Sequence, residues 1–191
     1  MDEKASVGKK IRSIRESKSI EIEVLAERAQ LPLEQVEAIE NGCPLPGLAP
    51  LIRIARVLGV RLGTFLDDQQ SVGAVVSRHE EERESVRFSN HGTAGHESMV
   101  YHSLSEGKEN RHLEPFVIDI LPTDNTGFDL SSHEGEEFIF VLDGMVEVVY
   151  GKHQYVLEKG DSIYYDSIVK HHVHGFDGSK AKILAVVYTP I

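Results

Sequence analysis

Apolar residues recur every three to four positions between residues 7 and 66. The apolar positions of five successive segments are Val7, Ile11 and Ile14, then Leu25, Ala26 and Ala29, then Val36 and Ile39, then Leu48, Leu51, Ile52, Ala55 and Leu58, and finally Leu62, Phe65 and Leu66. This spacing gathers them on one face of an α-helix. Pro32 precedes the third segment and Asn41-Gly42 follows it, as is typical of helix boundaries. The sequence therefore predicts five short helices that form a compact all-α unit.

After Asp67 the pattern changes to short runs that alternate with period two or are rich in β-branched and aromatic residues. These runs span residues 99–104, 116–121, 137–142, 145–150, 154–157, 162–165, 172–176 and 183–188. Turn signals such as Asp143-Gly144 and Lys159-Gly160 separate them. We therefore expect an all-β antiparallel sandwich or barrel in residues 98–191. Residues 68–97 are polar and predict a linker with at most a strand or two, which leaves residues 1–67 for the helical unit.

The charge of the chain is unevenly distributed. The 191 residues carry a formal net charge of −11. Residues 1–66 contain ten Lys and Arg, nine Asp and Glu, and no His, whereas the rest contains ten, 22 and all ten His. The acidic excess therefore lies outside the helical unit. It argues against binding along nucleic acids for the second part of the chain but not for the first.

Other sequence signals concern disulfides and membranes. A single Cys excludes a disulfide framework, and no apolar run reaches 18 residues. We expect a cytoplasmic protein with no leader and no membrane partner.

The helical unit resembles a repressor-type helix-turn-helix domain of the XRE family. The resemblance rests on the Leu25-Ala26 pair, the turn at residues 39–42 and the Ile54-Ala55…Leu58-Gly59-Val60 segment. It implies that the third helix enters the major groove of operator DNA while the second crosses the phosphate backbone. The implied DNA-contacting residues are Lys9, Lys10, Arg12, Arg28, Leu33, Glu34, Gln35, Glu37, Ala38 and Asn41.

The acidic residues in this set leave two interpretations of the helical unit open. Carboxylates repel phosphates and release no counterions, which disfavours DNA binding through Glu34 and Glu37. A Glu also accepts a hydrogen bond from a cytosine amino group, so Glu34 is a candidate for reading a base. Either the unit binds DNA, or it only folds, dimerises or covers its neighbour.

The second part resembles a cupin, which implies a jelly-roll barrel built as a double-stranded β-helix. The segment HEGEEFIFVLDGMVEVVYGKHQYVLEKGDSIYYDSIVKHHV carries both cupin motifs. His133, Glu137 and Gly144 match the first motif, in which Ser131 stands where the family usually has a first His. Gly160-Asp161 and His171 match the second motif.

Three of these residues have the chemistry of a metal site. His133 and Glu137 lie four positions apart where the chain enters a strand, so both point to one face, and His171 arrives from a second strand pair. Two imidazoles and one carboxylate form the facial triad typical of non-haem Fe(II), and Zn, Mn or Ni suits the same ligands. The alternative is a barrel that binds a small molecule without a metal.

Other polar and aromatic residues of the barrel are candidates for the walls of a pocket. Alternation requires one of Tyr101 and His102 to face inward, and Tyr164 alternates with Tyr165 in the same way. We therefore name Tyr101, His102 and Tyr164 as pocket candidates. Alternation along the strand places both His172 and His174 on the face opposite to His171, which predicts exposed positions for them.

Two functions from different classes follow. The favoured one is a transcriptional regulator, a homodimer or tetramer whose barrel senses a small-molecule effector. The alternative is a mononuclear non-haem iron oxidoreductase, since the segments VEAIENG, EPFVIDIL and HEGEEFIFVLDG also resemble the hydroxypropylphosphonate epoxidase family. Tyr101 matches a pocket tyrosine of that family. Its phosphonate-binding positions correspond to Ser19, Thr93 and Leu130, so we expect no cation here that would hold a phosphonate.

Overall fold

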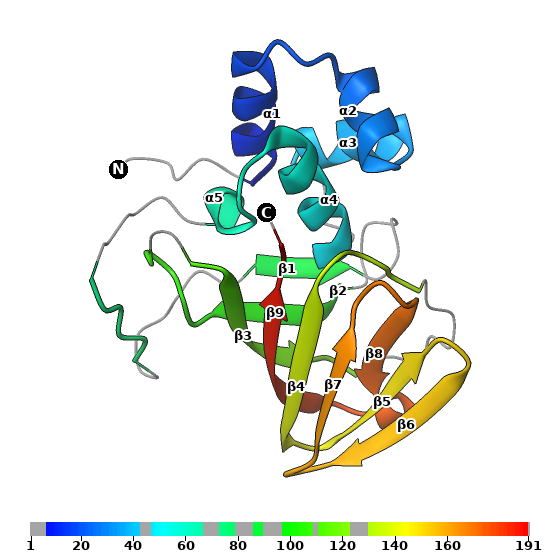
Figure 1. Cartoon of the computed structure of the whole chain (residues 1–191). Helices are drawn as coiled ribbons and strands as arrows, with labels where there is room; N and C mark the ends of the chain where they lie inside the picture. Colours follow the sequence, from blue (N-terminus) through cyan, green and yellow to red (C-terminus); the bar gives the residue numbers. More distant parts are fainter. Residues whose placement is uncertain are drawn as a thin grey trace.

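The structure is a computed structural model and describes residues 7–42, 47–66, 73–78, 86–89, 97–108, 111–122 and 130–190, with the backbone alone at 86–89 and 97–98. Helices occupy the first part of the chain and strands the second, as expected. Figure 1 shows the helices grouped at one end of the strands, with α4 close to them. No helix among the described residues is long and apolar enough to cross a membrane.

The helical part contains all five expected helices. They are α1 (Val7–Ser17), α2 (Ile22–Ala29), α3 (Leu33–Glu40), α4 (Leu48–Leu58) and α5 (Gly63–Leu66). The turn from α2 to α3 is tight because Gln30 adopts a left-handed conformation (φ 55°) and its N–H bonds back to carbonyls of α2. Pro32 then precedes α3 as its N-cap, where the missing N–H of proline costs the helix no hydrogen bond.

The predicted apolar faces of the helices form their core. Ile11, Leu25, Val36, Leu51 and Ile54 are fully or almost fully buried. Helices α1 and α3 approach each other closely at Gly8, where an added Cβ would lie 2.1 Å from the carbonyl oxygen of Ile39. The helical unit is therefore packed as the hydrophobic pattern predicts.

The strands form two antiparallel sheets. A six-stranded sheet has the order β1-β2-β3-β9-β4-β7, and a three-stranded sheet has the order β6-β5-β8. The strands are β1 (Val86–Ser89), β2 (Glu97–Ser103), β3 (Leu113–Ile120), β4 (Glu136–Asp143), β5 (Met145–Tyr150), β6 (His153–Glu158), β7 (Ser162–Asp166), β8 (His171–Gly175) and β9 (Ala181–Tyr188). Each of the eight expected runs corresponds to one of β2 to β9. Strand β1 lies within the expected linker and pairs with β2.

The interior of the β-domain follows the period-two pattern. Burial alternates along β3 and β9, and inward residues such as Phe116, Ile118 and Ile183 are almost inaccessible. The buried apolar residues of the helices and of the strands belong to one connected cluster. The two parts of the chain are therefore packed against each other.

Specific polar contacts mark this junction. Arg56 of α4 forms an ion pair with Glu134, just before β4. Arg111 pairs with the buried Glu114 of β3 at 2.8 Å. The guanidinium of Arg111 also lies beside Gly63 at the start of α5, where an added Cβ would clash with it. Helices α4 and α5 thus lie directly on the β-domain.

Candidate metal centre and the cavity beside it

Three elements place His133, Glu137 and His171 together. His133 precedes β4, Glu137 lies in β4, and His171 begins β8. The approach to β4 depends on Gly135, whose φ of +108° is left-handed and whose added Cβ would lie 1.9 Å from the carbonyl oxygen of Tyr188. His171 is fixed by paired backbone hydrogen bonds with Ser131, at 2.8 and 2.9 Å.

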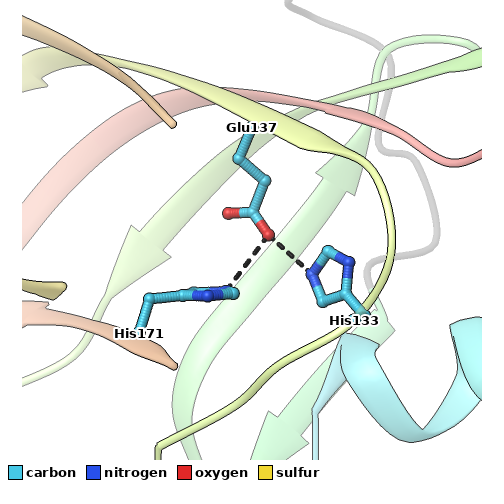
Figure 2. A group of neighbouring side chains, drawn as sticks. All are labelled: His133, Glu137 and His171. Atoms are coloured by element: carbon cyan, nitrogen blue, oxygen red, sulfur yellow. Dashed lines mark hydrogen bonds and ion pairs between the residues drawn. The ribbon is translucent and has the colours of Figure 1, made fainter. Parts of the chain in front are cut away.

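The three side chains converge on one point, as Figure 2 shows. Nε2 of His133 lies 2.7 Å from Oε1 of Glu137, and Nε2 of His171 lies 3.4 Å from the same oxygen. One ligand atom from each residue lies within 4.8 Å of the others. All three side chains are buried or nearly so, with exposures of 3%, 13% and 4%. The structure therefore brings together the three residues named from the motifs.

Backbone carbonyls orient both imidazoles. Nδ1 of His133 lies 3.0 Å from the carbonyl oxygen of Glu134, and Nδ1 of His171 lies 2.8 Å from that of Val169. A carbonyl accepts only from a protonated nitrogen, so these contacts place a proton on Nδ1 of each ring. Nε2 of each ring then faces Glu137, as in metal-binding histidines whose second nitrogen donates to an outer partner.

Glu137 is held by two hydroxyl groups as well as by the histidines. Tyr165 donates to Oε2 at 2.7 Å, and Ser167 donates to Oε1 at 3.4 Å. Burial alone would raise the pKa of Glu137, but the hydrogen bonds from His133 and His171 outweigh it and hold that pKa well below its usual range. The carboxylate is therefore ionised at neutral pH.

The charge of Glu137 acts on its neighbours. Burial alone would lower the pKa of His171, but the hydrogen bond and the charge of Glu137, together with the hydrogen bond to the carbonyl of Val169, outweigh it and raise that pKa above its ordinary value. Burial, aided by the Glu137 charge, raises the pKa of Tyr101. Burial and the same charge also raise the pKa of Tyr165 well above its ordinary value, so both phenols stay protonated at neutral pH.

A cavity of about 280 Å³ adjoins the three residues. Its walls come from the helices and from the strands: Leu31, Gln35, Gly47, Leu48, Ala49, Pro50 and Arg53 on one side, and Met99, Tyr101, Ile118, Leu130, Ser131, His133, Glu137, Ile139, His171, His172, Val173, Ile183, Ala185 and Val187 on the other. A volume of this size suits a small molecule rather than a polymer. Both the helices and the strands therefore line the same space.

The donor set fits a divalent transition metal. Two Nε2 atoms and one carboxylate oxygen match the ligands of mononuclear Fe(II), Zn, Mn and Ni sites. Ser131, which replaces the usual first His, donates its hydroxyl to the carbonyl oxygen of His171 at 3.2 Å and so has a structural role. Three protein ligands would leave coordination positions open toward the cavity.

Of the three pocket candidates, only Tyr101 lines the cavity. The register of β2 with β3 pairs Tyr101 with the buried Ile118, so Tyr101 faces inward. His102 pairs with Val117, faces outward and binds Asp119 at 2.8 Å. The prediction that His102 forms part of the pocket is therefore wrong.

The prediction for Tyr164 is also wrong. Glu137 of β4 pairs with Tyr165 of β7, so Tyr165 shares the inner face with Glu137. Tyr164 is 64% exposed and donates its hydroxyl to Glu136. Alternation along β7 places the two tyrosines on opposite faces, but the register with β4 decides that Tyr165 is the one that faces inward.

His172 and His174 are less exposed than predicted. His172 is buried, borders the cavity and pairs across the sheet with the buried Val149 of β5. His174 is half-buried and lies 3.1 Å from Glu147. The outer face of β8 is thus covered at these positions, which period-two alternation within one strand does not reveal.

The ten residues named as DNA contacts fall into three groups. Lys9 and Lys10 on α1, Arg28 on α2 and Leu33, Glu34, Glu37 and Ala38 on α3 are exposed or half-buried at the helix surfaces. Gln35 lies on the side of α3 that borders the cavity. Arg12 donates to Asn41 at 2.9 Å and to Glu40 at 3.1 Å, which connects α1 to the end of α3.

Sequence reasoning missed two residues of the site. Tyr165 is not among the candidates named from the sequence, because its hydrogen bond to Glu137 depends on the β4–β7 register. Arg53 lies in α4 and borders the cavity. Helical spacing places Arg53 on the same face of α4 as Ala49, but this spacing does not predict that the face lies against the β-domain.

Comparison with known families agrees with both domains. A helix-turn-helix model matches residues 11–65, and a cupin domain model matches residues 118–187. The chain is 31% identical over 180 residues to (S)-2-hydroxypropylphosphonic acid epoxidase of Streptomyces wedmorensis, with 80% of each chain covered. The chain belongs to the helix-turn-helix–cupin family.

Other proteins similar to this helix-turn-helix–cupin chain include regulators. The transcriptional regulator PuuR of Escherichia coli is 22% identical over 191 residues, which cover 99% of this chain and 97% of PuuR. An HTH_3 family transcriptional regulator from Vibrio cholerae has the same fold, with a TM-score of 0.66, 21% identity and coverage of 97% and 96%. The crystal structure of Fe(II)-HppE, the hydroxypropylphosphonic acid epoxidase, with the alternative substrate (S)-1-HPP is also similar to this chain. The TM-score is 0.53, the sequence identity is 27%, and 95% of this chain and 96% of that chain are covered.

Proposed function

We propose that this protein is a DNA-binding transcriptional regulator whose barrel binds a small-molecule effector next to a divalent transition metal. The observation that carries the proposal is the shared cavity, which has Gln35 of α3 and Arg53 of α4 on one wall and Glu137 on the other. An effector in this cavity touches the helical domain directly. The full-length similarity to PuuR supports the same function.

Ligand binding and DNA binding would act on the same helix. We expect α3 to enter the major groove with Leu33, Glu34, Glu37 and Ala38, while the basic residues of α1 and α2 contact phosphates. Gln35 belongs to this helix and borders the cavity. A ligand that binds one arrangement of the two domains more tightly shifts the population toward that arrangement, and so changes the affinity for DNA.

His133, Glu137 and His171 would hold the metal. The metal would supply positive charge and open coordination positions for a ligand, and the ionised carboxylate of Glu137 would contribute the one anionic ligand. The carbonyls of Glu134 and Val169 orient the two imidazoles for this role.

The proposal includes a domain organisation and an assembly. We assign residues 1–67 to the DNA-binding domain, 68–97 to the linker and 98–191 to the effector domain. We further propose that the two sheets form the double-stranded β-helix of cupins. A homodimer or tetramer would present two copies of α3 to two half-sites of an operator.

The proposal predicts that the purified protein shifts a DNA fragment carrying its own promoter at about 50 mM salt, where phosphate contacts are strongest. A fragment of equal length and scrambled sequence is the matched control. A protein that shifts neither fragment, or both equally at every salt concentration, would contradict a regulator that recognises an operator.

Metal binding has its own experiment. We expect metal analysis of the wild type to find about one transition-metal ion per chain, and the His133→Ala variant to lose most of it. The His153→Ala variant is the control, because His153 is an exposed residue of β6. Metal retained by His133→Ala would place the metal elsewhere.

One observation favours a second function, a mononuclear non-haem iron oxidoreductase. The His133–Glu137–His171 arrangement has the ligands of non-haem iron enzymes, and the chain is 31% identical to an epoxidase. In such an enzyme the helical domain would close the cavity rather than read DNA. Stoichiometric iron together with the absence of a promoter shift would favour it, and the lack of any bound transition metal would contradict it.

A further inference from the structure

One cation borders the cavity without a carboxylate partner among the described residues. Arg53 lies in the middle of α4, and its Nη1 donates to the carbonyl oxygen of Gln30 at 3.2 Å. Its Nε is buried and has no hydrogen-bond partner in the described part of the chain. A buried donor without an acceptor costs free energy, and an arginine remains charged at neutral pH.

The carboxylates near Arg53 are already paired with other groups. Glu137, the acidic residue among the described cavity walls, interacts with His133 and His171. On its other side Arg53 borders a smaller space that also includes Glu114 and Glu134. Glu114 pairs with Arg111, and Glu134 pairs with Arg56.

Arg53 is only partly buried, yet its charge has no carboxylate partner among the described residues. Desolvation lowers the pKa of Arg53 from its ordinary value. A ligand anion in the cavity would pair with the terminal nitrogens of the Arg53 guanidinium, and charge-assisted hydrogen bonds to a guanidinium are among the stronger polar contacts. The cavity walls around it are otherwise mostly apolar.

We infer that Arg53 binds the anionic group of the cavity's ligand, which is a small carboxylate or a small phosphate or phosphonate. This inference rests on the proposed ligand-binding function of the cavity. The remainder of the ligand lies toward His133, Glu137 and His171. The DNA-binding domain therefore supplies the anion-recognising side chain for a ligand that the barrel encloses, and a bound ligand holds the two domains together.

The test uses small probes of matched shape on the full-length protein. Propionate and propionamide have the same shape but differ in charge, and inorganic phosphate offers a tetrahedral anion. Binding is followed by NMR titration, including the Nε–H resonance of Arg53. We expect propionate or phosphate to shift this resonance and to bind at least about tenfold more tightly than propionamide. The stronger of the two anions indicates whether the ligand carries a carboxylate or a phosphate group.

Three variants isolate the role of Arg53. Arg53→Gln should weaken anion binding about tenfold or more and leave propionamide binding unchanged, whereas Arg53→Lys should retain part of the anion affinity. Arg56→Gln is the matched control, since Arg56 lies one turn further along α4, is largely exposed and pairs with Glu134. Its anion affinity should stay within about twofold of the wild type.

Several results would overturn the inference. Propionate and propionamide could bind equally well, or Arg53→Gln could keep the anion affinity of the wild type. Arg56→Gln could lose as much anion affinity as Arg53→Gln. Finally, neither anion could bind at about 50 mM, a concentration high enough to detect very weak binding. The DNA shift distinguishes this inference from the regulator proposal. If anion binding depends on Arg53 but the promoter does not shift, the inference stands and the regulator proposal fails. If the promoter shifts but anion binding does not depend on Arg53, the regulator proposal stands and the inference fails.

Discussion

Tyr165 donates a 2.7 Å hydrogen bond to Oε2 of Glu137, which leaves Oε1 as the oxygen nearest to both histidines. The two residues are direct cross-strand partners in β7 and β4. The tyrosine thereby fixes the rotation of the carboxylate about its own bond. Its contribution to a metal site would be orientation, not coordination.

The Tyr165→Phe substitution should weaken metal binding. It removes the donor to Oε2 and changes little of the ring packing, so the carboxylate becomes free to turn. We expect the affinity for Zn or Fe(II) to fall about tenfold or more, measured by competition with a chelator. Tyr164→Phe is the control, because the hydroxyl of Tyr164 contacts Glu136 on the outer face. Equal affinities of Tyr165→Phe and the wild type would rule out this role.

The Gly135→Ala substitution should disturb both folding and the metal site. Its Cβ would lie 1.9 Å from the carbonyl oxygen of Tyr188, and φ at this position is +108°. The chain between His133 and Glu137 would have to move, at a cost of about 2 kcal/mol or more in the free energy of unfolding. Denaturant unfolding and metal analysis measure the two effects.

Gly160→Ala separates strain from steric clash in this experiment. Gly160 also has a positive φ, of +95°, but nothing lies within 4 Å of an added Cβ. We expect a cost of about 1 kcal/mol there, with metal binding retained. If both substitutions had the same effect, the close approach to Tyr188 would not matter.

The buried carboxylate of Glu40 predicts a pH dependence of stability. Arg15 donates to it at 2.6 and 2.9 Å, and Arg12 at 3.1 Å. Burial would raise the pKa of Glu40, but these hydrogen bonds outweigh it and lower that pKa. Because the folded pKa lies below the unfolded one, the stabilisation is complete above the unfolded value, about 4.5, and is lost as pH falls through the folded value.

The Glu40→Gln substitution should therefore cost about 2 kcal/mol or more at pH 7 and less at pH 3. Urea unfolding followed by helical circular dichroism at both pH values measures the difference. Glu16→Gln is the control, since Glu16 is 62% exposed and only 3.7 Å from Arg15, and we expect less than about 0.5 kcal/mol for it. A loss for Glu40→Gln that is the same at both pH values would contradict the ionic explanation.

The acidic surface of α3 predicts an unusual response to charge removal. Glu34 and Glu37 are exposed and form part of the surface that would face the duplex. Replacing both with Gln should raise affinity for the promoter about threefold or more at 50 mM salt, with a smaller gain at 200 mM. Glu158→Gln, on the exposed surface of β6, should change nothing. A decrease in affinity would indicate that Glu34 reads a base.

The sequence predicted the elements better than their neighbours in space. Period-two alternation located every strand from β2 to β9, but it only requires one of Tyr101 and His102 to face inward. The choice depends on pairing with Ile118 of β3, far along the chain. The same holds for Tyr164 and Tyr165, whose assignment depends on Glu137 of β4. Register between strands is a tertiary property that spacing within one strand does not contain.

The three proposed metal ligands were predictable because their motif spacing already encodes a shared face. Arg53 was not, for a physical reason. The apolar stripe of α4 shows which side of the helix is buried, but not whether another helix or the barrel buries it. The expectation that no cation holds a phosphonate rested on Ser19, Thr93 and Leu130, whereas Arg53 borders the cavity from α4.

The two-sided cavity has a consequence for chimeric proteins. Exchanging the helical domain between relatives would replace Gln35 and Arg53 together with the proposed DNA-reading surface. Such a hybrid would acquire a new operator and a new chemical preference in one step. Likewise, an isolated barrel used to screen for ligands would lack one wall and select different molecules from those that the whole chain binds.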